Sequence, residues 1–327
     1  MSRRKSFQSP MAKISESEFE SHAMRLFHRQ AQENAVYRSY LQALGVNPLD
    51  VEQTSDIPFL PIEFFKTHEV KTGNWPSETI FESSGTSSSV KSFHHVEKEQ
   101  SYREHARAIF EDVFSPLSGT AVLALLPSYL ERTGSSLINM VEYFIEQSEN
   151  DASGFYLYNQ EALIQQLKLL KGSANVVLFG VTFALLELAK NYQLDLSHVT
   201  LIETGGMKGR GKELTRDELY QQISEKIQFK SIYSEYGMTE LFSQAYGVEG
   251  KFMVPASMRV QIRDINDPFA TVPVGSSGGI NIIDLANEHS CAFIETKDIG
   301  RLQTDGSFEV LGRIDNSELR GCNLLLA

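Results

Sequence analysis

Cysteine is scarce in this chain: Cys291 and Cys322 are the two among 327 residues. Two cysteines cannot supply the framework of a disulfide-rich secreted domain or the thiolate cluster of a structural zinc site. The chain also lacks an apolar run of roughly 18 residues, the length a membrane-spanning helix needs. No apolar stretch follows the basic residues 3–5, so we expect neither a signal peptide nor integral membrane association.

Basic residues are outnumbered, because 30 Lys and Arg stand against 42 Asp and Glu, for a formal net charge of −12. Nucleic acid and anionic membranes both require basic faces, so neither is an expected partner. Apolar residues make up 41% and charged residues 22% of the chain, which is ordinary for a globular protein. The expectation is a cytoplasmic enzyme, and the sequence leaves open whether it forms homo- or hetero-oligomers.

Alternating patterns predict an α/β fold with a mainly parallel sheet and flanking helices. Residues 15–44 carry apolar side chains at helical spacing and predict one or two helices. The predicted strands that follow are 121–126, 175–180, 199–204 and 231–234, and the predicted helices are 98–114, 137–147, 160–170, 183–190 and 215–227. After about residue 246, shorter strands separated by turns rich in Asp, Gly and Asn predict a β-rich subdomain. We therefore expect a single domain over 1–327, with an α/β core (1–245) and a β-rich part (246–327).

A serine-rich stretch, Glu82 to Ser92, follows the strand-like residues 79–81. Its hydroxyls, the backbone N–H groups around Gly85 and the ammonium of Lys91 are groups that bind phosphate. The stretch departs from a P-loop, because Val90 stands where that loop needs its second glycine. A solvated serine linker is the alternative.

Two further polar segments follow predicted strands. Residues 236–240, Tyr-Gly-Met-Thr-Glu, come after strand 231–234, and a Gly-Gly pair follows strand 199–204. In an open α/β sheet, ligands bind outside the carboxyl ends of the strands. We therefore expect these segments and the serine-rich stretch to line one crevice. There, glycine turns would admit a flat base, hydroxyls would meet phosphate and a carboxylate would hold Mg²⁺.

Four elements together resemble the adenylate-forming superfamily. Residues 83–92 align without gaps with its phosphate loop, S-S-G-T-T-G-x-P-K-G, although this chain lacks the second glycine and the proline before lysine. Residues 236–240 match its Y-G-x-T-E motif, 296–298 resemble its T-G-D element and 312–315 resemble its G-R-x-D hinge. The four elements occur in the order that the superfamily has, which makes their combination far more specific than any one of them.

Within that superfamily the chain resembles the LuxE-type acyl-protein synthetases, which are related to phenylacetate-CoA ligases. The segments that carry this resemblance are 57–66, 204–210, 235–240 and 320–322. The resemblance implies the large domain of an adenylate-forming enzyme. Because the sequence stops shortly after the hinge-like residues, we expect the small C-terminal domain, with its catalytic lysine, to be absent.

The resemblance implies that ATP and Mg²⁺ are the cofactors. The phosphate loop, with Ser84, Gly85, Thr86, Ser87 and Lys91, would hold the β- and γ-phosphates.

The motif that begins with Tyr236 and Gly237 would complete the nucleotide site. In it, Glu240 would bind Mg²⁺ and Thr239 the α-phosphate. An ordinary helix start with capping residues is the alternative for these two positions.

Four more residues are assigned to the nucleotide by the resemblance. Gly205 and Gly206 would flank adenine, Asp298 would bind the ribose hydroxyls, and Arg313 would bind ribose or phosphate. A plain turn is the alternative for the glycines, and a surface ion pair is the alternative for the two charged residues.

The resemblance implies activation of a carboxylic acid, which is a fatty acid in LuxE-type enzymes, to acyl-AMP. The acyl group would then be transferred to Cys322 as a thioester and delivered to a partner protein, a reductase or carrier. A thiolate is a competent nucleophile for that step; an idle or core thiol is the alternative for Cys322, and Cys291 is expected in the core. Lys208 and Arg210 are candidates, by position, for the cation that replaces the missing lysine.

Two other functions stay open at this point. One is an acyl- or aryl-CoA ligase, since residues 320–323 resemble a hinge segment of phenylacetate-CoA ligases. The other is a non-catalytic nucleotide-binding subunit of a larger complex. The apolar residues around 181–183 suit a hydrophobic acid, and the pair His94-His95 is expected to be structural, because no metal-ligand spacing accompanies it.

Overall fold

The computed structural model of the chain describes residues 14–83, 90–126, 134–173, 175–205 and 216–314. The described residues form two compact units that interleave along the sequence. The first, here called the parallel unit, comprises residues 100–238 and 244–252. The second, the antiparallel unit, comprises the described residues up to 99, then 239–243 and those from 253 onward. The division expected at residue 245, between a core and a β-rich subdomain, stays a prediction.

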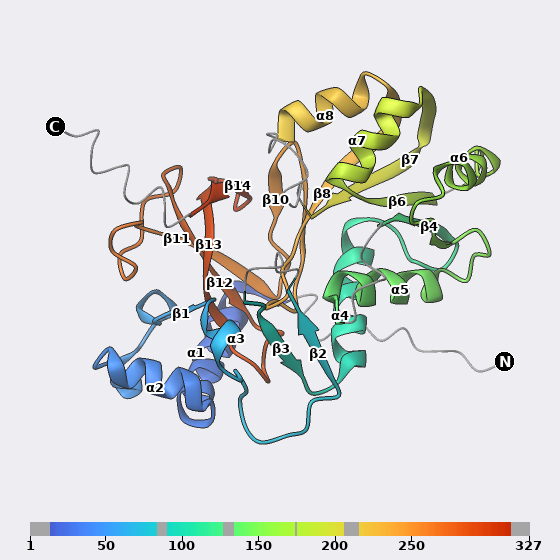
Figure 1. Cartoon of the computed structure of the whole chain (residues 1–327). Coiled ribbons are helices and arrows are strands. Elements are labelled where there is room, and N and C mark those ends of the chain that lie inside the picture. The colour runs from blue at the N-terminus through green and yellow to red at the C-terminus, as the bar shows by residue number, and fades with distance from the viewer. Residues whose placement is uncertain (1–13, 84–89, 127–133, 174, 206–215, 315–327) are drawn as a thin grey trace. The chain divides into compact units, whose positions relative to one another are not determined.

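The parallel unit is built on five parallel strands in the order β5-β4-β6-β7-β8 (Figure 1). Their bounds are Thr120–Leu125 for β4, Gly154–Phe155 for β5, Asn175–Val181 for β6, Leu194–Thr204 for β7 and Ile227–Tyr236 for β8. β9 (Ala245–Val248) pairs antiparallel with β8, and β10 (Lys251–Met253) follows it. All six side chains of β4 are buried, as expected of a parallel strand that is covered on both faces.

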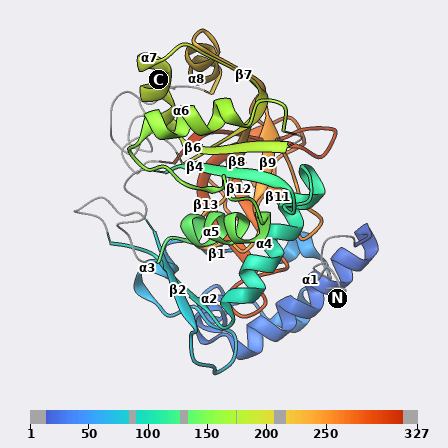
Figure 2. The same cartoon turned by 90° about the vertical axis from the view of Figure 1, so that its right-hand side faces the viewer.

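Five helices accompany these strands: α4 (Glu99–Val113), α5 (Ser136–Ser148), α6 (Gln160–Leu169), α7 (Thr182–Asn191) and α8 (Arg216–Ser224). Figure 2 shows α6 and α7 on one face of the parallel strands and α4 and α5 on the other. The predicted alternation of helices and buried strands is therefore confirmed in this unit. The predicted capping residue at 215 lies outside the described residues.

Two strands are longer than predicted. β7 begins at Leu194 rather than Val199, and its first residues pair with the start of β8, where Leu194 lies opposite Ile227. In that extra segment Asp195 and Ser197 are exposed, so the polar residues alternate with apolar ones and no continuous apolar run marks the strand. β8 likewise continues to Tyr236, so the first residue of the Tyr-Gly-Met-Thr-Glu motif belongs to the sheet.

The antiparallel unit contains β11 (Met258–Arg263), β12 (Ser277–Asp284), β13 (Phe293–Leu302) and β14 (Phe308–Arg313), paired in chain order. The short strand β1 (Leu60–Pro61) joins β13 in parallel. Two single-turn 3₁₀ helices, Pro48–Asp50 and Thr54–Asp56, and the short helix α3 (Phe64–Thr67) flank it.

The serine-rich stretch follows a strand as predicted, but that strand does not belong to the parallel sheet. β2 (Thr79–Glu82) pairs antiparallel with β3 (Phe93–Val96) in a separate two-stranded sheet. The stretch therefore connects the strands of a hairpin. The strands before the two glycine-containing segments, β7 and β8, belong to the larger sheet, and this pairing depends on distant partners that a local pattern does not identify.

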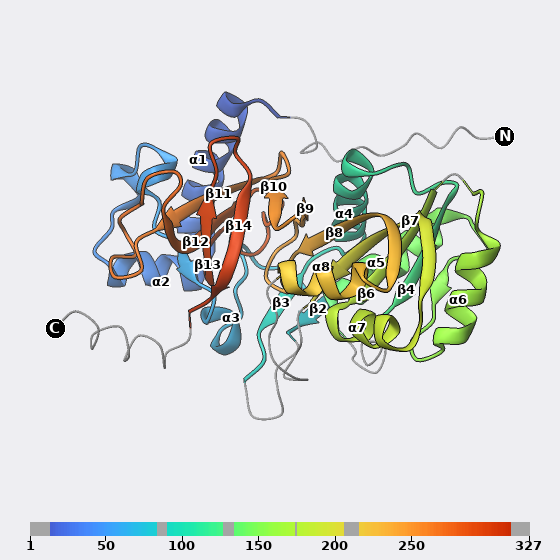
Figure 3. The ribbon, with the colours of Figure 1, turned by 90° about the horizontal axis from the view of Figure 1, so that it is seen from above.

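Two N-terminal helices cover strands of the antiparallel unit (Figure 3). α1 (Glu16–Glu33) begins with a capping box formed by Ser15 and Glu18, and α2 (Ala35–Ala43) begins at Asn34, whose side chain accepts a hydrogen bond from the Tyr37 backbone. These two helices confirm the prediction for residues 15–44. Phe27 and Tyr37 both pack on the ring of Phe293 in β13.

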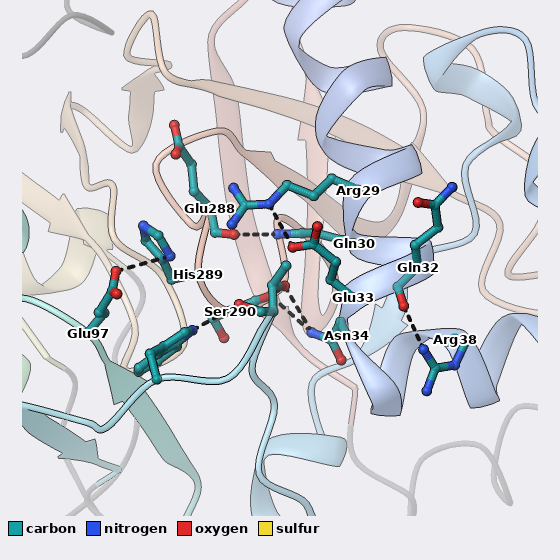
Figure 4. A network of polar contacts seen from close by, with 12 residues as sticks. Arg29, Gln30, Gln32, Glu33, Asn34, Arg38, Glu97, Glu288, His289 and Ser290 are labelled. Carbon is teal, nitrogen blue, oxygen red and sulfur yellow. Dashed lines mark hydrogen bonds and ion pairs between the residues drawn. The ribbon is translucent and has the colours of Figure 1, made fainter.

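A network of side chains ties these helices to the connection between β12 and β13 (Figure 4). Gln30 donates to the Asn287 carbonyl at 3.0 Å and accepts from the Ala292 N–H at 2.9 Å. Asn34 donates to the Ser290 carbonyl at 3.0 Å, where the Thr72 hydroxyl also donates at 2.6 Å. The buried backbone groups of an irregular connection thus find partners in side chains.

Candidate nucleotide and acid site

Glu240, the charged residue of the Tyr-Gly-Met-Thr-Glu motif, is buried, with 5% of its surface exposed. Burial raises the pKa of its carboxyl group, while a hydrogen bond from the Ser92 side chain and the positive charges of Arg313 and Lys66 act in the opposite direction. All four residues lie in the antiparallel unit. Among the residues that the structure describes, no basic side chain forms an ion pair with Glu240. A carboxylate that has lost its hydration without such a partner is suited to hold a further positive charge.

The backbone on both sides of this carboxylate is held by side chains. His94 Nδ1–H donates to the Thr239 carbonyl at 2.7 Å, and Asn287 Nδ2 donates to the Glu240 carbonyl at 2.8 Å. His94 is fully buried, and burial lowers its pKa to about 4, so the ring is neutral and has one N–H to give. The structural role expected for this histidine is confirmed.

Asp284 anchors the next two residues. Its carboxylate accepts from the backbone N–H groups of Phe242 at 2.8 Å and Ser243 at 2.9 Å, and from the Ser243 hydroxyl at 2.7 Å. Asp284 and Asn287 both belong to the region that the helices α1 and α2 support. The segment 239–243 is therefore fixed from several directions, which sets the position of the Glu240 side chain before any ligand binds.

Asp298 and Arg313 are cross-strand partners in β13 and β14. Arg313 Nε lies 3.7 Å from Asp298 Oδ1, and the Arg313 side chain is largely exposed. The ion pair given as the alternative for these residues is thus present. Exposed pairs of this kind contribute little free energy, so the pairing leaves Arg313 available to an anionic ligand.

Lys91, assigned to the phosphates, makes an ion pair across the neck of the hairpin. Its Nζ lies 2.8 Å from Glu82 Oε2, and half of the lysine side chain is exposed. Below it, Ser92 N–H donates to the Ser83 hydroxyl at 2.8 Å, and Ser83 N–H donates to the Ser92 carbonyl. The described ends of the serine-rich stretch are thus held together, with the lysine at the surface.

The parallel unit contains the remaining described residues of the predicted site. Gly205 follows β7 and has a φ of +82°, a conformation that glycine adopts without strain. The ring of Tyr236 is buried and packs against Phe252 with ring centroids 5.7 Å apart. A Cβ atom at Gly237 would overlap the Glu235 carboxylate, which would have to move to admit it.

Glu235 was not predicted as a site residue. Thr204 donates to its Oε2 at 2.5 Å. Burial raises the pKa of Glu235 to about 7, and the charge of Glu203 adds to that increase. Glu203 itself is buried and accepts hydrogen bonds from Thr182 and Ser234. Two glutamates at the carboxyl ends of neighbouring strands, each before a polar or glycine turn, were the signal in the sequence.

The raised pKa of Glu235 has a measurable consequence for stability. Between pH 4.5, the ordinary value, and pH 7, the native state keeps a proton that the unfolded chain has released. The contribution of Glu235 to the free energy of unfolding is therefore fully present below about pH 4.5 and is lost as the pH rises to about 7. At 1.36 kcal/mol per pKa unit, the loss amounts to at most about 3 kcal/mol. We expect Glu235→Gln to remove this loss. As the pH rises across that range, the free energy of unfolding of the variant should therefore increase relative to that of the wild type.

Urea unfolding followed by circular dichroism at pH 4.5 to 8 measures this difference. Glu187→Gln is the matched control, because Glu187 is exposed on α7 of the same unit, and its stability should run parallel to the wild type at every pH. Parallel behaviour of Glu235→Gln and the wild type would contradict a protonated Glu235 in the native state.

Several predicted site residues lie outside the described residues. They are Ser84, Gly85, Thr86, Ser87, Gly206, Lys208, Arg210 and Cys322. The roles expected for them stay predictions. Cys291 is fully buried, with a pKa raised to about 12 by burial, so its assignment to the core is confirmed.

The two units each gather part of the predicted site. Glu240, Arg313 and Asp298 belong to the antiparallel unit, together with Ser92 at the end of the serine-rich stretch. Gly205, Tyr236 and Gly237 belong to the parallel unit. Among the residues that the structure describes, no three His, Cys, Asp or Glu are placed to hold a metal ion, and no helix is long and apolar enough to cross a membrane.

No protein-family model matches the sequence, and no curated protein sequence matches it. Solved structures do resemble its fold. A 2-hydroxyisobutyryl-CoA ligase (HCL) in complex with 2-HIB-AMP and CoA aligns with a TM-score of 0.68 and 13% identity, over 94% of this chain and 70% of that one. An ATP-bound RpMatB-BxBclM chimera aligns with a TM-score of 0.54 and 17% identity, over 72% of this chain and 47% of that one.

ATP-bound MatB from Rhodopseudomonas palustris gives a TM-score of 0.50 with 16% identity, again over 72% of this chain and 47% of the MatB chain. This chain thus spans about half the length of the MatB proteins that it matches. At these identities the likeness is one of fold. The chain has a mixed α/β fold with flanking helices that matches the structures of adenylate-forming ligases, as the sequence predicted.

Proposed function

We propose that this protein activates a carboxylic acid with ATP, giving an acyl-adenylate and pyrophosphate. The observation that carries the proposal is the surrounding of Glu240. There, the end of the serine-rich stretch (Ser92) and the hinge-like Arg313 both act on the buried carboxylate of the Tyr-Gly-Met-Thr-Glu motif. These groups come from three of the four elements by which the sequence resembles adenylate-forming enzymes. The fold, shared with ligases solved with ATP or an acyl-AMP, supports the same function.

The residues around Glu240 fit a magnesium ion. Mg²⁺ is typically held by one or two carboxylates together with the phosphates of a substrate and water, and a single carboxylate is what the described residues offer. Glu240 would hold the ion, with its direction set by the contacts of Thr239 and Asn287. When bound, Mg²⁺ supplies positive charge that offsets the charge of the phosphate oxygens.

In the proposed reaction a carboxylate oxygen of the acid attacks the α-phosphorus of ATP. A new oxygen–phosphorus bond forms, the bond to the oxygen that bridges to the β-phosphate breaks, and pyrophosphate leaves with that electron pair. The protein contributes by positioning and by neutralising charge. Lys91, Lys66 and Arg313 are the described cations suited to this task.

The further steps rest on residues outside the described ones. We propose Lys208 and Arg210 as additional cations, Thr86 and its neighbours as phosphate ligands, and Cys322 as the thiol that takes the acyl group for delivery to a partner protein. Transfer to CoA is the second candidate for this step, favoured by the fold shared with CoA ligases. A fatty acid is our proposal for the substrate, as in LuxE-type enzymes.

Exchange of radioactive pyrophosphate into ATP, measured with a panel of fatty and aryl acids, tests the proposed activation. We expect exchange that depends on one class of acid and on Mg²⁺. ATP binding without exchange on any acid would contradict activation and favour a nucleotide-binding subunit. Mass spectrometry after incubation with ATP, Mg²⁺ and the acid, with and without CoA, identifies the acceptor. An acyl adduct at Cys322 supports the acyl-protein route, and acyl-CoA formed in the sample with CoA, without an adduct, supports the CoA route.

A further inference from the structure

A polar pair in the parallel unit is not used by the nucleotide site. Glu235 in β8 and Tyr246 in β9 are opposite each other in the antiparallel ladder, so their side chains stand on the same face of the sheet. Burial and, to a smaller extent, the charge of Glu235 raise the pKa of the Tyr246 hydroxyl. Neither side chain has an assigned role in binding ATP.

The Tyr246 hydroxyl is buried without a hydrogen-bond partner among the described residues. The side chain is 1% exposed, and a buried hydroxyl left unpaired costs about 1–3 kcal/mol. The ring cannot easily turn away, because it packs edge-on against Phe110 and Phe114, with centroids 6.3 and 5.1 Å apart. The fold thus holds the Tyr246 hydroxyl in a fixed direction without an acceptor among the described residues. An unpaired buried donor of this kind is a feature of a ligand site.

Glu235 offers a matching acceptor. Thr204 occupies its Oε2, and no described residue donates to Oε1. That oxygen lies over Gly237, in the space that a Cβ atom would fill. Glu235 is only partly buried, and Gly205 and Gly237 beside it are exposed, so a ligand can approach the free oxygen from the side of the two glycines.

A hydroxyl group satisfies both partners at once, because it donates to Glu235 Oε1 and accepts from the Tyr246 hydroxyl. Phosphate does not fit, since the charge of Glu203, joined by that of Glu235 above about pH 7, repels an anion. The next residue of β8, Tyr236, belongs to the nucleotide motif, and successive side chains of a strand point to opposite faces. The pair therefore faces away from the side on which Tyr236 stands, which favours the acid over the nucleotide as its ligand.

We propose that Glu235 and Tyr246 recognise a hydroxyl substituent on the acid, remote from the carboxylate that is activated. This inference rests on the proposed acid activation and names its substrate class, a hydroxy acid. A site that hydrogen-bonds a substrate hydroxyl rejects the analogue that lacks it, since both protein groups are then left unpaired.

Matched acids test the inference: octanoate against 8-hydroxyoctanoate, and benzoate against 4-hydroxybenzoate. We expect kcat/KM in pyrophosphate exchange to favour the hydroxylated member of at least one pair by about tenfold or more. Tyr246→Phe, which removes only the hydroxyl, should abolish that preference by lowering the value for the hydroxylated acid, with KM for ATP unchanged. Tyr233→Phe is the matched control, because Tyr233 belongs to the same aromatic cluster, and it should keep the preference.

Preference for unsubstituted acids in both pairs would overturn the inference while leaving acid activation intact, and so would a preference that survives Tyr246→Phe. A raised KM for ATP in Tyr246→Phe, with the preference retained, would assign the pair to the nucleotide instead. Calorimetric binding of the same acids without ATP separates the two proposals. Tighter binding of the hydroxylated acid, lost in Tyr246→Phe, supports the inference even if no exchange occurs, and absence of both binding and exchange overturns both.

Discussion

Glu240→Gln should lower acid-dependent pyrophosphate exchange by on the order of 10²–10³-fold. A magnesium ion contributes several kcal/mol to stabilising charge in a transition state, and each 1.36 kcal/mol corresponds to tenfold in rate. The substitution keeps the size of the side chain and its hydrogen-bonding oxygen but removes the charge that would hold the ion. The exchange assay with saturating ATP and a range of Mg²⁺ concentrations measures the effect, and we expect the residual activity to need more Mg²⁺.

The same variant should not be less stable than the wild type. Burial raises the pKa of Glu240, so the ionised side chain is unfavourable in the ligand-free native state at neutral pH, and a neutral amide avoids that cost. Loss of exchange with unchanged or higher stability would therefore separate a functional role from a structural one. Glu52→Gln is the matched control, because Glu52 is exposed in the same unit. Exchange within about threefold of the wild type, with the same need for Mg²⁺, would contradict the metal role of Glu240.

The regular part of the fold was predictable because burial on both faces leaves a clear pattern. Strands β4 and β6 are enclosed by helices, so nearly every side chain in them must be apolar, and a short apolar run marks each one. The helices α1 and α4 bury one face and show apolar residues at helical spacing. Of the first five residues of β7 only Leu196 is buried, so no apolar run marks the start of that strand.

Pairing between distant segments was less accessible to sequence analysis. Nothing in residues 79–96 distinguishes a strand of the parallel sheet from one strand of a hairpin, since both are short and apolar. The same holds for the support of the candidate site. Asp284 and Asn287 lie 42 and 47 residues from the backbone groups that they bind, and only the folded sheet brings them there.

Residues of short motifs can be proposed as site residues from the sequence, whereas residues that depend on their environment cannot. Glu240 stands in a recognisable motif, so it could be proposed without a structure. Glu235 stands one residue before that motif, where a glutamate at the end of a strand would ordinarily be solvated. Its raised pKa results from enclosure and from the charge of Glu203, and both are properties of the packed sheet.

Asp284→Ala should cost about 3–5 kcal/mol of unfolding free energy. Four donors, the N–H groups of Phe242, Ser243 and Ala286 and the Ser243 hydroxyl, lose one fully buried carboxylate. Hydrogen bonds to a charged group are worth about 1.5–3 kcal/mol each, but the four share one acceptor group, so their losses do not add. Urea unfolding followed by the fluorescence of Trp75 measures the effect. Trp75 is the single tryptophan of the chain and lies in the same unit.

The same substitution should also reduce exchange at temperatures where the protein stays folded. Asp284 fixes residues 242 and 243, and only Leu241 separates them from Glu240, so loss of the anchor lets the carboxylate move from its preset position. Asp267→Ala is the matched control. Asp267 is exposed and accepts from the Phe269 N–H at 3.0 Å, a bond that water replaces, so it should change stability by less than about 1 kcal/mol and leave exchange intact. Equal stability of Asp284→Ala and the control would mean that the segment 239–243 is held by His94 and Asn287 without help from Asp284.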